Sequence, residues 1–142
     1  MKSIIKFFGT LTLLVLAFAP AAPQAQAQSK RLLVLKAPFA FTVENQKLPA
    51  GTYWITLREG WLQIQTAEGK AVTSVLTLPV STAKAEGTAR VIFHQYHDGY
   101  FLSEVWPASS ERGRQTLESR EEQRSRKQEA PQAVVVQLTA GK

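Results

Sequence analysis

Two histidines and an aspartate lie close together in the second half of the chain. His94, His97 and Asp98 carry imidazole and carboxylate groups, which are ligands for divalent transition metals. On an extended strand, however, residues three apart point to opposite faces of the sheet. We therefore expect His94 on a strand and His97 in the turn after it, with no metal site and no cofactor.

No catalytic motif accompanies these histidines. The chain has no Gly-x-Ser-x-Gly sequence, no glycine-rich phosphate loop and no cysteine. Glu44, Glu59, Glu68 and Glu86 fall in or beside expected turns, where solvated charge is the usual state. A pair of carboxylates that meets only in the folded chain stays open as an alternative. The sequence thus favours a non-enzymatic protein over a hydrolase whose site is not visible in the sequence.

Aromatic, amide and guanidinium side chains alternate along residues 54–65. If a two-residue turn at 59–60 joins two strands there, one sheet face carries Trp54, Arg58, Trp61, Gln63 and Gln65. Indole rings can stack on a sugar or another flat ligand, amides can bond to hydroxyls, and Arg58 can lie over Trp61 as a cation–π pair. The pattern predicts a glycan-binding face. The alternative is that these rings pack beneath another part of the protein.

A strongly charged segment begins near Ser109 and ends near Pro131. Between residues 109 and 128 it holds six basic and four acidic residues. Ser109 or Ser110 can cap a helix there, and Leu117 is its only large apolar side chain. Candidate contacts for an anionic polymer are Arg120, Arg124, Arg126 and Lys127. A solvated helix laced with ion pairs is the alternative, since the two signs nearly balance.

Short apolar runs and turn residues alternate between residues 31 and 106, which is typical of an all-β domain. The alternation predicts six or seven antiparallel strands in a small sandwich or partly open barrel, followed by the charged helix or tail. Asp98-Gly99 is the strongest hairpin signal in the chain. The run from Val134 to Leu138 is strand-like, and it either adds to a sheet edge, here or in a partner chain, or stays loose.

The first 27 residues read as a signal peptide. Lys2 and Lys6 precede an apolar run too short to span a bilayer, and Ala25-Gln26-Ala27 provides a small-x-small cleavage site. We therefore expect export to the periplasm or beyond, and no membrane span in the mature chain. The expected parts are the signal peptide (1–27), a β domain (28–108), a charged helical segment (109–130) and a strand-like tail (131–142). The net charge of the whole chain is +6, a bias that favours anionic partners.

Several short motifs resemble a family of small exported proteins common in acidobacterial genomes, whose members are uncharacterised. They are Pro38-Phe39-x-Phe41-x-Val43, Leu48-Pro49-Ala50-Gly51-x-Tyr53, Val91-x-Phe93-His94-x-Tyr96 and Tyr100-Phe101-Leu102-x-x-Val105-Trp106. The resemblance covers roughly residues 36–127 and implies export and small size, but no activity, ligand or site residue.

Taken together, these observations predict an exported, non-enzymatic binding or scaffold domain at the cell envelope, with no nucleic acid as partner. A glycan-binding module that uses the tryptophan face is the first alternative, and an envelope polysaccharide or another anionic envelope component is the partner class. A hydrolase is the second alternative.

Overall fold

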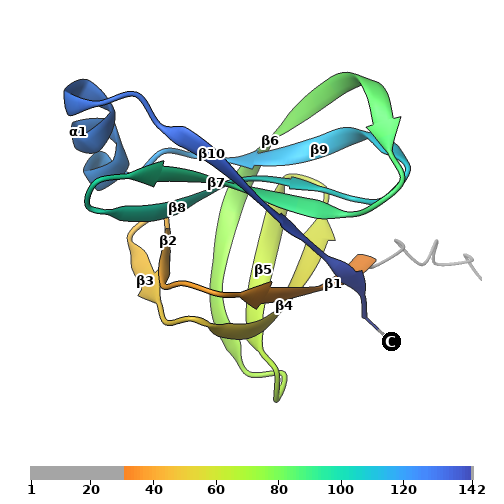
Figure 1. Ribbon diagram of the computed structural model, residues 1–142. Coiled ribbons are helices and arrows are strands. Elements are labelled where there is room, and N and C mark those ends of the chain that lie inside the picture. The colour runs from red at the N-terminus through yellow and green to blue at the C-terminus, as the bar shows by residue number, and fades with distance from the viewer. Residues whose placement is uncertain (1–30, 142) are drawn as a thin grey trace, which may run out of the picture.

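The alternation of apolar residues in the sequence becomes a sheet of many short strands (Figure 1). The computed structural model describes residues 31–141, which form eleven strands and one helix. The strands are β1 (Arg31–Ala37), β2 (Phe41–Val43), β3 (Gln46–Leu48), β4 (Gly51–Arg58), β5 (Trp61–Thr66), β6 (Ala71–Glu86), β7 (Arg90–Tyr96), β8 (Gly99–Trp106), β9 (Ser110–Thr116), β10 (Gln132–Gln137) and β11 (Thr139–Ala140). The helix is α1 (Arg120–Gln128), between β9 and β10.

All the strands belong to one open, mixed sheet. Its hydrogen-bonded order is β10-β7-β8-β9-β6-β5-β4-β1-β11, and the β2–β3 hairpin attaches to β8. The β2–β8 pair is parallel, at Thr42 and Phe101, and the other pairs are antiparallel. The predicted all-β class with a charged C-terminal helix is confirmed.

The long strand β6 connects the two halves of the sheet. Its first part pairs with β5, up to Leu76 opposite Trp61, and its second part pairs with β9 from Thr77 onward. The amide of Thr77 still donates to the carbonyl of Gly60, on the β5 side. Backbone amides two residues apart on a strand point to the same side. After the amide of Thr77, the next one to face the β5 side would therefore belong to residue 79, which is a proline. A proline there fits an edge with no partner strand, because proline has no amide to offer.

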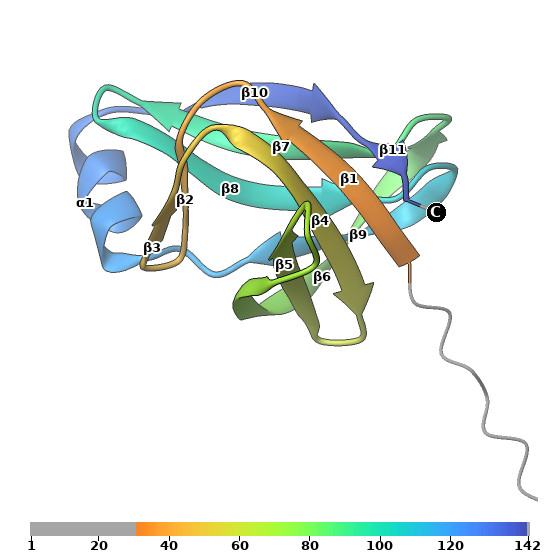
Figure 2. The ribbon, with the colours of Figure 1, turned by 90° about the horizontal axis from the view of Figure 1, so that it is seen from below.

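The last strands lie along both ends of this sheet. β10 pairs with β7 and, two residues later, β11 pairs with β1. Between them, the amide of Leu138 donates to the carbonyl of Ala89. Figures 1 and 2 show this segment crossing from the β7 side to the β1 side. The strand-like run from Val134 to Leu138 therefore completes the sheet within the same chain.

The core fills the space between the two halves of the sheet. Its fully buried side chains come from β1, β2, β4, β5, β7 and β8, and include Leu35, Val43, Ile55, Leu62, Ile64, Val91, Phe93, Leu102 and Val105. Phe93 contacts the rings of Phe39 and Phe41 edge-on. Each such side chain contributes roughly 1.5–3 kcal/mol by leaving water.

The prediction that residues 109–130 form one helical segment is wrong in its first half. Residues 110–116 form β9, and the helix starts only after Ser119, not after Ser109 or Ser110. Ser109 instead has a positive φ of 53° in the turn between β8 and β9. Pairing with β6 and β8 outweighs the local helix preference of these charged residues.

Three further features differ from the sequence prediction or lie beyond it. Pro79 and Ser81 are turn-type residues that indicate a loop after residue 78, yet strand β6 continues to Glu86. The structure has eleven strands rather than six or seven, and β3, β9 and β11 are among those that were not predicted. The signal peptide expected at residues 1–27 lies outside the described residues, and within those residues there is no helix suited to cross a bilayer.

Candidate functional site

The register of β4 and β5 brings the five candidate glycan-binding residues onto one face. Trp54 lies opposite Gln65, and Arg58 lies opposite Trp61 across the two-residue turn, as the sequence predicts. Gln63 lies between Trp61 and Gln65 on the same face. The residues between them, Tyr53, Ile55, Leu57, Leu62 and Ile64, are buried in the core. The five side chains thus form one outward surface, which we call the tryptophan face.

The tryptophan face is partly exposed to solvent. Trp54 and Trp61 are both half-buried, while Arg58 is exposed and its guanidinium carbon lies 5.1 Å from the centroid of the Trp61 ring. The amide nitrogen of Gln65 donates to the side-chain oxygen of Gln63 at 3.3 Å. This contact fixes the orientation of both amides and leaves donors and acceptors for a ligand.

Thr56 is a buried residue in the middle of this face. It belongs to the outward set, opposite Gln63, yet it is completely buried. Its hydroxyl has no hydrogen-bond partner among the described residues. An unsatisfied buried hydroxyl is costly.

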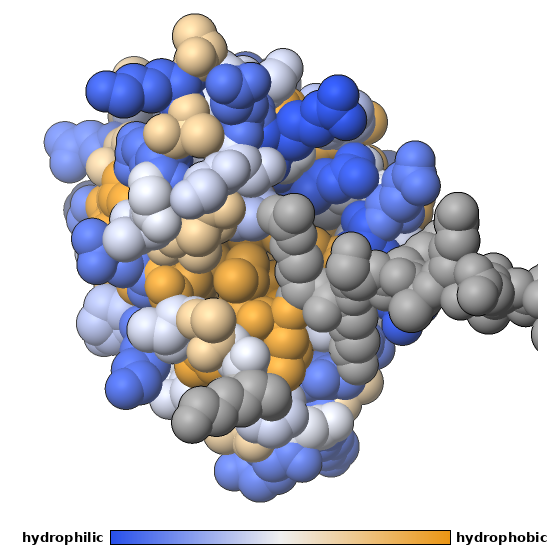
Figure 3. Space-filling view, turned by 90° about the vertical axis from the view of Figure 1, so that its right-hand side faces the viewer, coloured by the Kyte–Doolittle hydropathy of each residue, from blue (hydrophilic) through white to orange (hydrophobic). Residues whose placement is uncertain are grey.

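Two exposed leucines of β6 lie beside the tryptophan face. Leu76, opposite Trp61, is 67% exposed, and Leu78 is 53% exposed. The sequence does not mark these leucines as exposed, because in an alternating strand they have the pattern of ordinary core residues. Figure 3 shows the side of the molecule where β1 begins and the described chain ends, with hydrophobic residues gathered in its middle and hydrophilic ones around them.

The two histidines do not meet. The Nδ1 atom of His94 lies 2.8 Å from Oε1 of Glu122 on α1, and the backbone amide of His97 donates to the carboxylate of Glu129. As predicted, His94 is on a strand and His97 is in the turn after it. The described residues contain no group of three or more side chains arranged to hold a metal ion.

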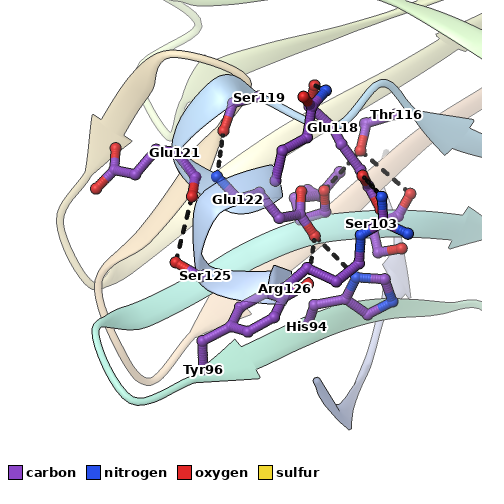
Figure 4. A network of polar contacts seen from close by, with 12 residues as sticks. His94, Tyr96, Ser103, Thr116, Glu118, Ser119, Glu121, Glu122, Ser125 and Arg126 are labelled. Carbon is purple, nitrogen blue, oxygen red and sulfur yellow. Dashed lines mark hydrogen bonds and ion pairs between the residues drawn. The ribbon is translucent and has the colours of Figure 1, made fainter. Parts of the chain in front are cut away.

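Glu122 is the centre of a buried polar cluster (Figure 4). Its side chain is almost inaccessible, with the residue 3% exposed, and its carboxylate also accepts a hydrogen bond from the Tyr96 hydroxyl at 3.4 Å. The hydrogen bond to Glu122 raises the pKa of His94, against the opposing effect of burial. Burial, followed by the charge of Glu122, raises the pKa of Tyr96 to about 12.

Sequence reasoning could not find this cluster. Glu122 and His94 are 28 positions apart, and nothing local marks either one. A second contact of the same kind joins Ser125 on α1 to Asp98 in the hairpin turn, at 2.8 Å. Both contacts attach α1 to the tip of the β7–β8 hairpin, which Figures 1 and 2 place beside the helix.

The four candidate residues for an anionic polymer divide into two kinds. Arg126 pairs with Glu118 at 3.1 Å, whereas Arg120, Arg124 and Lys127 are exposed and pair with no carboxylate among residues 31–141. Beside Arg120 lies an open cleft of about 270 Å³, lined by Glu44, Asn45, Leu117, Glu118, Ser119 and Arg120. His94 and Tyr96, whose pKa values are shifted, do not line it.

Comparisons with models of protein families, with curated proteins and with solved structures gave no match for this chain. The resemblance to small exported acidobacterial proteins stays a prediction.

Proposed function

We propose that this chain is an exported, non-enzymatic binding domain at the cell envelope, and that the tryptophan face is its binding surface. One observation carries the proposal: Trp54 and Trp61 remain half-open to solvent on a rigid pair of strands, with Arg58 over Trp61 and oriented amides at Gln63 and Gln65. Rings held this way offer flat apolar area with little loss of conformational entropy on binding.

The chemistry of this face favours a saccharide. A sugar ring presents an apolar face that stacks on indole and a rim of hydroxyls that bond to amides. The contacts of His94 support a structural rather than a catalytic role for this residue. Among the described residues, its side chain bonds to Glu122 and not to a serine or threonine hydroxyl.

The test is a fluorescence titration of the purified protein with a panel of neutral envelope and plant-type polysaccharides. We expect a shift in tryptophan emission with at least one of them, and a loss of affinity of about tenfold or more in Trp61→Ala. Trp106 is buried, so it adds a constant background. The absence of any shift across the panel would overturn the saccharide assignment.

Leu76→Ala is the matched control, since Leu76 is the exposed neighbour opposite Trp61. If stacking on indole drives binding, Leu76→Ala keeps the affinity that Trp61→Ala loses. Equal losses in both variants would point to an apolar protein partner instead. Turnover of a polysaccharide that a single polar substitution abolishes would contradict the non-enzymatic proposal.

A further inference from the structure

Helix α1 separates its charges by sign. On and just before the helix, the acidic residues Glu118, Glu121 and Glu122 each pair with a basic residue of the same chain: Arg126 at 3.1 Å, Lys47 at 3.3 Å and His94 at 2.8 Å, respectively. Just after it, Glu129 accepts the amide of His97. Acidic and basic residues are nearly equal in number in this part of the sequence. Because the acidic ones are already paired, the outer surface of the helix carries an excess of basic residues.

The basic residues that remain share one side of the helix. Arg120, Arg124 and Lys127 are spaced by four and three positions, which places them within about 60° of one another around the axis. The docked side chains, Glu122 and Ser125, lie roughly opposite. The three outward residues, which we call the cationic row, span about 10 Å along the axis.

The row is held in a fixed orientation. The Ser119 hydroxyl caps the helix by accepting the amide of Glu122 at 3.1 Å, and Ser125 and Glu122 anchor the helix to the sheet. The last turn carries Arg126 and Lys127, where cations complement the helix dipole. A pre-oriented row loses less entropy on binding than the same residues would in a flexible tail.

The composition of α1 indicates what kind of partner fits. The helix sequence REEQRSRKQ contains no apolar side chain, so it has nothing to insert into the hydrocarbon boundary of a membrane. Its cations follow one another at intervals of about 5–6 Å, a spacing that an extended chain with repeated anionic groups can meet at several points together.

We propose that Arg120, Arg124 and Lys127 form a binding site for a linear anionic polymer bearing phosphate or carboxylate groups. This proposal rests on the proposed function only in that both describe an exported binding domain, because the row and the tryptophan face are different surfaces.

The test measures binding of the purified full chain to polyphosphate and to polygalacturonate, with neutral dextran as the reference polymer. We expect binding to at least one anionic polymer, and the stronger of the two identifies the anionic group. Three neutralised charges predict a slope of about −2 for log affinity against log salt concentration. No binding to either anionic polymer at low salt would overturn the proposal.

Two variants with equal loss of charge separate the row from a general attraction. The first replaces Arg120, Arg124 and Lys127 by Gln, which keeps a similar helix propensity. The second replaces Lys70, Lys84 and Arg112 by Gln, since these exposed residues lie on or beside β6 and β9. We expect the first to lose about tenfold or more in affinity and the second to lose little. Equal losses would overturn the proposal.

The last measurement is binding of the chain to vesicles of neutral and of anionic lipids. If anionic vesicles bind the chain as tightly as the polymers and the row variant removes both, the site recognises a charged surface and the polymer assignment is wrong. Because neutral saccharides test the tryptophan face, failure of one proposal is distinguishable from failure of the other.

Discussion

At the scale of single residues, His94 links stability to pH. Its hydrogen bond to Glu122 raises the pKa of the imidazole in the folded state above its ordinary value near 6.5. A raised pKa means that the folded state holds the proton more tightly than the unfolded state. The resulting stabilisation is complete below about pH 6.5 and is lost as the pH rises through the folded-state pKa.

The expected outcome is a free energy of unfolding that falls as the pH rises above about 6.5, because His94 then loses its proton. The measurement is urea unfolding across this range for the natural protein and for His94→Gln, which cannot titrate. His97→Gln is the control, since its link to the helix runs through the backbone amide. If His94→Gln and the natural protein show the same pH dependence, the assignment to His94 is wrong.

Gly113 of β9 is a second residue whose role follows from one distance. A Cβ atom at this position would lie 2.7 Å from Cδ2 of the Trp106 ring. The ring is held in place by Arg90, 5.2 Å from its centroid, and by its own bond to Glu104 at 2.7 Å. Glycine is therefore required here by space, and not by backbone conformation.

We expect Gly113→Ala to lower the free energy of unfolding by about 1–3 kcal/mol, the usual cost of overpacking. Without the clash, alanine in a strand would be favourable by roughly 0.5–1 kcal/mol. Gly87→Ala is the matched control, because nothing lies within 4 Å of the Cβ that it would add. Urea unfolding distinguishes the two, and equal stability of both variants would show that the Trp106 ring moves freely.

At the scale of elements, the strands could be predicted and the docking of the helix could not. The alternation of Tyr53, Ile55 and Leu57, together with the turn at Asp98-Gly99, marks strands and a hairpin without reference to distant residues. Strand β9 shows no such alternation, because its buried residues are Gly113 and Thr116, which are three positions apart and are not large apolar residues. Its partners, and not its own sequence, make it a strand.

The candidate surfaces divide in the same way. The tryptophan face follows from strand periodicity and a single turn, so the sequence predicts its membership. The cationic row depends on which carboxylates are paired with other basic residues, and two of those partners, Lys47 and His94, are far away in the sequence. Residue spacing alone does not show that Arg126, rather than Arg124, pairs with Glu118.

Helix α1 is attached by polar contacts, which makes its docking sensitive to one carboxylate. We expect Glu122→Gln to cost about 1.5–3 kcal/mol, the range for a hydrogen bond to a charged group. Hydrogen exchange should show faster exchange over residues 120–128. Glu121→Gln is the control: its pair with Lys47 is exposed, and such pairs contribute about 0–1 kcal/mol. Equal protection of the helix in both variants would contradict this account.

At the scale of the whole molecule, the C-terminal segment substitutes for closure of the sheet. An open sheet leaves two edges that can pair with other chains. Here β10 covers the β7 edge, and β11 covers the β1 edge. One segment of nine residues, 132–140, therefore protects both ends of the sheet, and Leu138 is the point at which it crosses from one to the other.

Leu138 is the residue that anchors this crossing to the core. It is 6% exposed and packs in the main hydrophobic cluster, whereas Val135 of the same segment is 56% exposed. We expect Leu138→Ala to cost about 2–5 kcal/mol, as for other buried leucines, and Val135→Ala to change stability by less than about 1 kcal/mol. Urea unfolding measures the difference. Light scattering should also show self-association of Leu138→Ala, because a loosened segment exposes both edges. If Leu138→Ala is as stable and monodisperse as Val135→Ala, the segment does not hold the sheet together.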